Sequence, residues 1–153
     1  MAQEKCNLTN APKLLNLNLG MTTAEVKNSF GKDLKIKVKN TGERSFFQNY
    51  IDKPATNSLR GIRALYLRFL DGRLYQIEIF YENRSDWQTL LDFTKSLSVQ
   101  MNFAENVWQI KQNNALIECR EFSVLANNVL NPHIEITNET EFAKVKEMRK
   151  KTN

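Results

Sequence analysis

The chain has 153 residues, of which 41% are hydrophobic and 25% are charged, and it carries a formal net charge of +5 at pH 7. These values suit one globular domain, and no apolar run approaches the roughly 20 residues that cross a bilayer as a helix. We therefore expect no transmembrane segment. The basic residues are dispersed and no recognition motif for nucleic acid is present, so nucleic acid is not an expected partner.

The N-terminal residues are polar and lack the basic and apolar regions of a signal sequence. A short polar start of this kind is what remains after a signal peptide has been removed. We therefore expect an exported protein, periplasmic or extracellular; a cytoplasmic protein is the alternative. After export, Cys6 and Cys119 are expected to form one disulfide, whereas in a reducing compartment they stay free thiols. Because the chain has no CxxC and no Cys/His cluster, no metal site is expected.

Residues 14–19 alternate as an edge strand does, and a helix is expected directly after them. Thr22 is a good N-cap, Glu25 completes a capping box, and Gly31 ends the helix. Each conspicuous residue between positions 19 and 31 is thus explained by helix formation, and the stretch indicates no functional site.

Residues 34–40 alternate apolar and basic side chains, which predicts a half-buried strand. The basic positions are Lys35, Lys37 and Lys39. Residues 40–59 show no clean period and form a connection of about twenty residues, longer than most loops. This connection contains three aromatic residues: Phe46, Phe47 and Tyr50. We interpret them first as a short strand or a small hydrophobic cluster, and second as the lip of a binding surface.

Residues 62–81 form the clearest hairpin of the chain, with Asp71-Gly72 as a two-residue type I′ turn. In the regular register Tyr66 lies opposite Ile77, and both belong to an apolar face. The other face mixes polar residues with five large apolar ones: Leu65, Leu67, Phe69, Leu74 and Phe80. Such a face is too apolar for simple exposure to solvent, so either a second layer or a partner is expected to cover it.

Four further elements are expected in the second half: a helix over 85–101, a hairpin over 106–125 that turns at Asn113-Asn114, a strand over 132–137 and a helix over 138–151. In the hairpin, Trp108 shares a face with Ile117, and a bulge near Arg120 would return Phe122 and Val124 to a useful orientation. In the last helix, Asn138 is the expected N-cap.

The order of elements predicts a single α+β domain over residues 1–153, with an antiparallel sheet and helices packed on one face. Residues 14–82 and 85–137 both run from a capped helix into about three strands. We interpret them as two half-repeats, followed by the C-terminal helix at 138–151.

The pattern LxLGMTxxEVxxxFG, followed by strands with the hairpin F-x-DGRLYxIEIxY, resembles the repeat unit of small bacterial envelope proteins. These include the SmpA/OmlA-type lipoproteins of outer-membrane assembly and the β-lactamase inhibitor protein, whose halves share a helix-then-strands plan. The matching residues are Gly20, Met21, Thr22, Val26, Phe30 and Gly31, with the hairpin from Phe69 to Tyr81. The chain departs from the lipoproteins at Lys32, where they usually have Pro, and it lacks their lipobox. The resemblance implies a fold and a cell-envelope location, and it implies no catalytic site.

No constellation of nucleophile and base is visible, so we expect a protein without enzymatic activity or cofactor. His133 is the only histidine of the chain, and we interpret it as a residue at a strand edge. An enzyme that uses His133 and Glu135 is kept as one alternative.

The leading functional hypothesis is an exported module that holds a protein partner. Its expected contacts come from the outer sheet face and the 40–59 connection: Leu65, Leu67, Phe69, Leu74, Phe80, Phe46, Phe47 and Tyr50. A second hypothesis is a pocket for a small ligand or lipid between sheet and helices. That pocket would be lined by Tyr66, Tyr75 and Trp108.

Overall fold

The computed structural model describes residues 8, 11–31, 34–50, 59–82, 92, 108–111, 114–118, 121–127 and 132–152. The described helices are α1 (Thr23–Phe30) and α3 (Glu139–Thr152). The described strands are β1 (Glu43–Asn49), β2 (Ile62–Leu70), β3 (Arg73–Tyr81), β4 (Trp108–Lys111), β5 (Asn114–Glu118), β6 (Phe122–Asn127) and β7 (His133–Asn138). The expected helix over 85–101, apart from Asp92, and the two cysteines lie outside the described residues.

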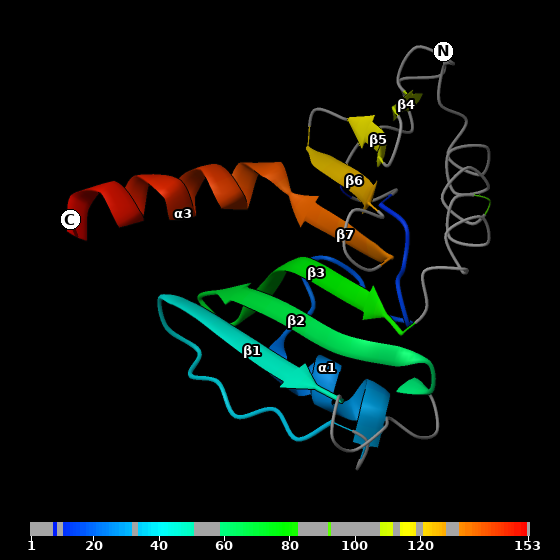
Figure 1. Cartoon of the computed structure of the whole chain (residues 1–153). Coiled ribbons are helices and arrows are strands. Elements are labelled where there is room, and N and C mark those ends of the chain that lie inside the picture. Colours follow the sequence, from blue (N-terminus) through cyan, green and yellow to red (C-terminus); the bar gives the residue numbers. More distant parts are fainter. Residues whose placement is uncertain are drawn as a thin grey trace.

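All seven strands belong to one antiparallel sheet in the order β1-β2-β3-β7-β6-β5-β4. The prediction of an α+β fold is therefore confirmed. β7 is the last of the described strands in the chain but lies between β3 and β6, so it joins the first three strands to the next three (Figure 1). Among the described residues, neither helix has the length and apolar character that a membrane-crossing helix requires.

The start of α1 forms as its sequence predicts. The Thr22 side chain accepts a hydrogen bond from the Glu25 backbone N–H, and the Glu25 carboxylate accepts one from the Thr22 backbone N–H. This reciprocal pair satisfies two of the backbone donors that a helix start leaves unpaired. The helix ends at Phe30, and Gly31 follows with a positive φ of 55°.

Two predicted strands are wrong. Residues 14–19 fold into a turn instead, in which Leu14 and Leu17 exchange backbone hydrogen bonds and Leu15 and Asn16 have positive φ angles. Residues 34–39 do alternate between inward and outward side chains, with Leu34 and Ile36 buried, but they join no ladder. The 40–59 connection contains β1 instead, which confirms the first interpretation of its aromatic residues.

The β2–β3 hairpin turns at Asp71-Gly72 as predicted, with positive φ angles at both residues. Its register is not the regular one, however. Phe69 pairs with Leu74 and Arg68 pairs with Gln76, so Tyr75 is an extra residue on β3. Because a shift of one residue moves a side chain to the other face of a strand, this bulge exchanges the faces that the sequence predicted.

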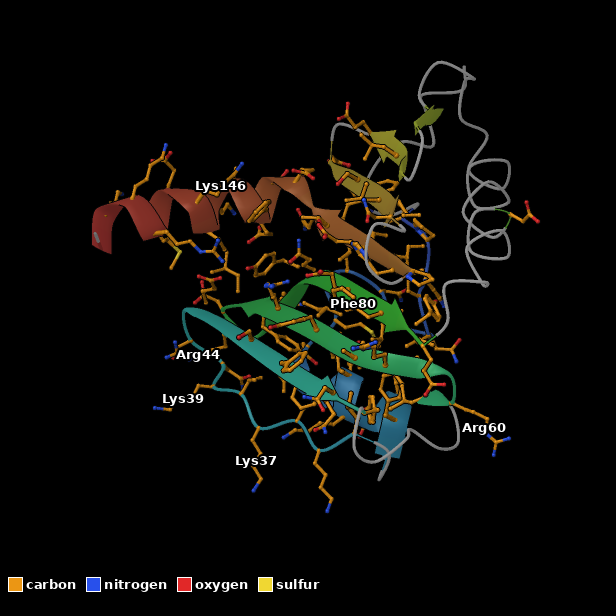
Figure 2. All side chains as sticks on the ribbon, viewed as in Figure 1. Lys37, Lys39, Arg44, Arg60, Phe80 and Lys146 are labelled. Atoms are coloured by element: carbon orange, nitrogen blue, oxygen red, sulfur yellow. The ribbon has the colours of Figure 1, made fainter. Side chains whose placement is uncertain are left out.

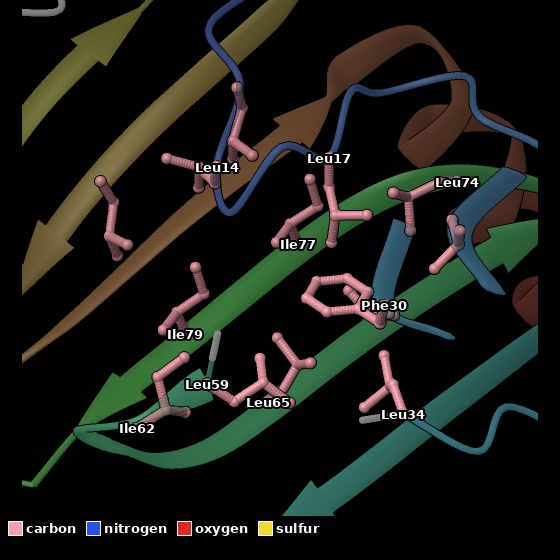
Figure 3. Close-up of a cluster of buried hydrophobic side chains, with 14 of the residues drawn as sticks. Leu14, Leu17, Phe30, Leu34, Leu59, Ile62, Leu65, Leu74, Ile77 and Ile79 are labelled. Atoms are coloured by element: carbon pink, nitrogen blue, oxygen red, sulfur yellow. The ribbon is translucent and has the colours of Figure 1, made fainter. Parts of the chain in front are cut away.

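The corrected register puts Leu67 opposite Ile77 and Leu65 opposite Ile79, and all four side chains lie in the main core. Figure 3 shows this core between the sheet, α1 and the turn at 14–17. Four of the expected partner contacts are at most 1% exposed and cannot reach a partner: Leu65, Leu67, Phe69 and Leu74. That part of the predicted binding surface is wrong, because α1 and the N-terminal turn are the second layer that covers it.

The two described helices contact different sides of the sheet. α1 contributes Val26 and Phe30 to the main core, whereas α3 places Val145 in a second cluster with Leu70 and Tyr75. Figure 1 shows α1 behind β1 and β2, and α3 leaving the end of β7. Of the described helices, α1 alone packs on the core face. The Asn138 side chain accepts from the Glu141 backbone N–H, which confirms the predicted N-cap of α3.

The β4–β5 hairpin differs from its prediction by one position. Lys111 pairs with Asn114, so the two-residue connection is 112–113, and Trp108 lies opposite Ile117, where the predicted turn would have placed Ile110. On β6, Phe122 and Val124 are fully buried, which agrees with their predicted inward orientation.

Candidate functional site

The side of the sheet that faces away from the main core carries both polar and aromatic residues. We call it the outer face; it consists of Phe47 on β1, Tyr66 and Arg68 on β2, Gln76, Glu78 and Phe80 on β3, and His133, Glu135 and Thr137 on β7. On β2, β3 and β7 these residues alternate with buried residues, and Phe47 pairs with Tyr66, so their side chains point to one side.

Aromatic rings and a guanidinium form the β1 end of the outer face. The ring centroids of Phe47 and Tyr66 are 4.3 Å apart, and the Arg68 guanidinium lies 4.6 Å from the Tyr66 ring centroid. Phe47 is 46% exposed although it stacks on Tyr66. Aromatic and arginine side chains in this arrangement give large contact area at a small entropic cost, which is typical of binding surfaces.

Arg68 connects this end to a polar network on β3. Its Nη1 donates hydrogen bonds to Gln76 Oε1 and, over 2.7 Å, to Glu78 Oε1. Both charged side chains are largely shielded from solvent, with 25% of Arg68 and 15% of Glu78 exposed. The ion pair therefore holds Glu78 in a defined position on the outer face.

The network continues onto β7 through Gln76. Its Nε2 donates to Glu135 Oε1 over 3.0 Å and to Thr137 Oγ1 over 2.9 Å, and the Thr137 hydroxyl in turn donates to Glu135 Oε1. Burial, and then the negative charge of Glu78, raise the pKa of the Glu135 carboxyl, while the Thr137 hydrogen bond opposes the rise. Two carboxylates thus lie directly opposite each other, since Glu78 pairs with Glu135 in the β3–β7 ladder.

His133, the first residue of β7, lies on the same face as Glu78 and Glu135. It pairs with Phe80 across the same ladder, and the two rings stack with centroids 4.9 Å apart. One ligand atom each from Glu78, His133 and Glu135 lie within 4.8 Å of one another. The fold thus brings His133 and Glu135, the pair of the enzyme alternative, together with a third group that the sequence did not indicate.

Exposed basic residues occur on β1 and on the segment that precedes it. Residues 34–39 present Lys35, Lys37 and Lys39 to solvent, and Arg44 on β1 is exposed as well. Figure 2 shows Lys37, Lys39 and Arg44 reaching outward. We call Lys35, Lys37, Lys39 and Arg44 the basic row. β1 is the end strand of the sheet, and within the described residues it pairs with β2 alone.

The remaining predicted contacts divide between the core and the outer face. Phe46 and Tyr50 are partly buried against the main core, while Phe47 and Phe80 lie on the outer face. The expected ligand pocket is not formed by its tyrosines, since Tyr66 stacks with Phe47 whereas Tyr75 packs beside Phe142. The Trp108 side chain lies outside the described residues.

Sequence reasoning missed Arg68, Gln76 and Glu78 as members of a site. In the regular register both faces of the hairpin were mixed, with Gln76 and Glu78 beside Leu65 and Leu67. A shift of one residue moves Gln76 and Glu78 away from Leu65 and Leu67 and places Ile77 and Ile79 beside these leucines, and this separation was the signal that could have revealed the polar group.

Comparisons with models of known protein families, with curated proteins and with solved structures each give no match. The resemblance to SmpA/OmlA-type envelope proteins therefore stays a prediction, and the site is interpreted from its own geometry.

Proposed function

We propose that the protein is a non-enzymatic, exported interaction module that binds a protein partner at the β1 end of the outer face. Phe47 carries this proposal, because a large aromatic ring that is 46% exposed stacks on Tyr66 next to a guanidinium. A partner that covers Phe47 and Tyr66 gains burial of apolar area at about 25 cal/mol per Å².

The positive charge of the basic row favours a partner with acidic residues. Four exposed cations stand on β1, the strand that carries Phe47, or on the segment that precedes it in the chain, and the chain as a whole has a net charge of +5. Complementary charge speeds association and selects among partners. We therefore infer that the partner segment places an aromatic or large apolar side chain on Phe47 and acidic residues opposite the basic row.

Export is part of the same proposal, together with a disulfide between Cys6 and Cys119. The support is a long-range contact: the backbone N–H of Leu8 donates to the Glu121 carboxylate over 2.7 Å. Each of these residues stands two positions after a cysteine, so the fold brings both chain segments together.

Selection from a library of random twelve-residue displayed peptides tests the proposed binding surface. We expect the selected peptides to combine an aromatic residue with Asp or Glu, and to lose at least about tenfold in affinity for Phe47→Ser, which corresponds to the loss of one hot-spot contact. Met148→Ser is the matched control, because within the described part of the chain Met148 is the other exposed large apolar residue, 40% exposed and on α3. Peptides that bind Phe47→Ser as tightly as wild type would overturn the proposal.

A further inference from the structure

We propose that Glu78, His133 and Glu135 form a binding site for a divalent transition-metal ion of the Zn²⁺ type on the outer face. The chemistry differs from that of a simple acidic surface, since one imidazole nitrogen and two carboxylates converge from two adjacent strands. Their ligand atoms lie within 4.8 Å of one another. This site is independent of the partner surface at Phe47.

The sheet register explains why these three groups meet. Glu78 on β3 pairs with Glu135 on β7, and His133 stands two residues before Glu135, so all three side chains point to the outer face. In the sequence, Glu78 and His133 are 55 positions apart. The expectation of no metal site rested on cysteine and histidine spacing, which cannot reveal such a cross-strand group.

The charges of the cluster favour a cation. Two carboxylates directly opposite each other on a sheet destabilise it, because like charges in a cross-strand pair repel. The guanidinium of Arg68 offsets part of this repulsion from the side of Glu78 Oε1. Bound between the two carboxylates, a doubly charged ion removes the rest.

The types of ligand atom and the distances between them indicate which metal ion the site would bind. One nitrogen and two oxygen ligands suit Zn²⁺, whose bonds of about 2.0–2.1 Å place tetrahedral ligands about 3.3 Å apart. The three ligand atoms, which are at most 4.8 Å apart, would have to move closer together by about 1.5 Å or less to reach that separation. Rotation about the side-chain torsions allows this movement. Mg²⁺ and Ca²⁺ prefer more ligands, all of them oxygen, so they are expected to bind more weakly.

Neighbouring residues hold two of the ligands in place. Gln76 and Thr137 both donate to Glu135 Oε1, which orients the carboxylate in the way that outer-shell partners of metal ligands do. The stacked ring of Phe80 restricts the His133 imidazole. Three protein ligands leave the fourth position of a tetrahedral ion for water or for a group of a bound partner.

Titration of the full chain with Zn²⁺ alone, after cysteine thiols have been blocked with iodoacetamide, tests the site. Calorimetry is expected to give one equivalent bound with a Kd below about 1 mM. Since His133 is the only histidine, its ring signals in ¹H–¹⁵N spectra identify the ligand without ambiguity, and we expect them to shift until saturation. Co²⁺ is expected to give the visible absorption of a four-coordinate ion.

Variants distinguish this site from weak binding by a lone imidazole. Glu135→Gln keeps an oxygen that accepts from Gln76 and Thr137, so it preserves the fold, and it is expected to weaken Zn²⁺ binding at least about tenfold. His133→Ala is expected to do the same, whereas Glu82→Gln, an exposed carboxylate just after β3, leaves binding unchanged. The proposal is overturned if wild type shows no saturable binding below about 1 mM, or if Glu135→Gln binds as tightly as wild type. Because no peptide or partner takes part, this result is separate from the test of Phe47.

Discussion

Glu43 and Arg149 are 106 positions apart in the sequence, yet they form an ion pair that joins the edge strand β1 to the C-terminal helix α3. Both Arg149 Nε and Nη2 donate to the Glu43 carboxylate, which also accepts a hydrogen bond from the Tyr75 hydroxyl over 3.0 Å. Tyr75 is fully buried in the cluster that receives Val145 of α3. A single carboxylate therefore connects β1, the bulge of β3 and α3.

This connection predicts a specific dependence of stability on pH. The hydrogen bond from Arg149, followed by that from Tyr75, lowers the pKa of Glu43 below its ordinary 4.5, and burial opposes the shift. A carboxyl whose pKa is lowered in the folded state stabilises the fold above its unfolded pKa, and the stabilisation is lost as the pH falls through its folded pKa. We expect Glu43→Gln to be less stable than wild type by about 0.5 kcal/mol at pH 7, because half-exposed ion pairs are screened by solvent.

Urea unfolding at pH 7 and at pH 3 measures this difference. The free energies of unfolding of wild type and Glu43→Gln are expected to differ less at pH 3 than at pH 7, and to converge at pH 7 in 1 M NaCl, where screening is strong. Glu147→Gln is the matched control, since the Glu147–Lys150 pair on α3 is highly exposed. A difference between wild type and Glu43→Gln that stays constant across the pH range would show that the ion pair contributes nothing.

Two glycines with similar positive φ angles allow a second prediction. Gly61 and Gly72 have φ angles of +86° and +77°, so alanine is strained at both positions by about 1 kcal/mol. A Cβ at Gly72 would also lie 3.1 Å from Asn40 Oδ1 and 3.2 Å from Asn40 Cβ, whereas a Cβ at Gly61 meets nothing within 4 Å. We therefore expect Gly72→Ala to lose more stability than Gly61→Ala, by about a further 1 kcal/mol.

The Asn40 side chain, which an alanine at position 72 would displace, links the hairpin turn to α1. Asn40 Oδ1 accepts a hydrogen bond from the Thr23 hydroxyl at the start of α1. Thermal unfolding of the two glycine variants measures the difference, and Asn40→Gly combined with Gly72→Ala is expected to remove most of it. Equal losses in Gly61→Ala and Gly72→Ala would mean that the close approach of Asn40 is unimportant.

Local signals in the sequence predicted much of this fold. The capping box at Thr22, the cap at Asn138 and the turn at Asp71-Gly72 depend on residues at most four positions apart, and all three form as predicted. The alternation of residues 34–39 was also correct for burial. The alternation did not reveal that residues 34–39 form no strand ladder, because ladder formation depends on which strand lies beside a segment.

The candidate site could not be predicted in the same way, because it depends on one extra residue. The bulge at Tyr75 is stabilised by distant groups, Glu43 through a hydrogen bond and Val145 through packing, and neither is close in sequence. Without that bulge, the regular register assigns Leu65 and Leu67 to the outer face and hides Gln76 and Glu78 among them. The error in the predicted binding surface therefore follows from a single register shift.

The contact between Leu8 and Glu121 leads to the last prediction, a disulfide between Cys6 and Cys119. Leu8 and Glu121 are joined by a hydrogen bond of 2.7 Å, and each of them follows a cysteine by two positions in the sequence. For protein secreted into an oxidising compartment, we expect thiol titration to find no free thiol when the chain is denatured without reductant, and two after reduction. The bond would close a loop of more than 100 residues, so Cys6→Ser is expected to lose about 2–4 kcal/mol of stability under oxidising conditions and almost none in reductant. Two titratable thiols in the unreduced chain would refute the disulfide and weaken the case for export.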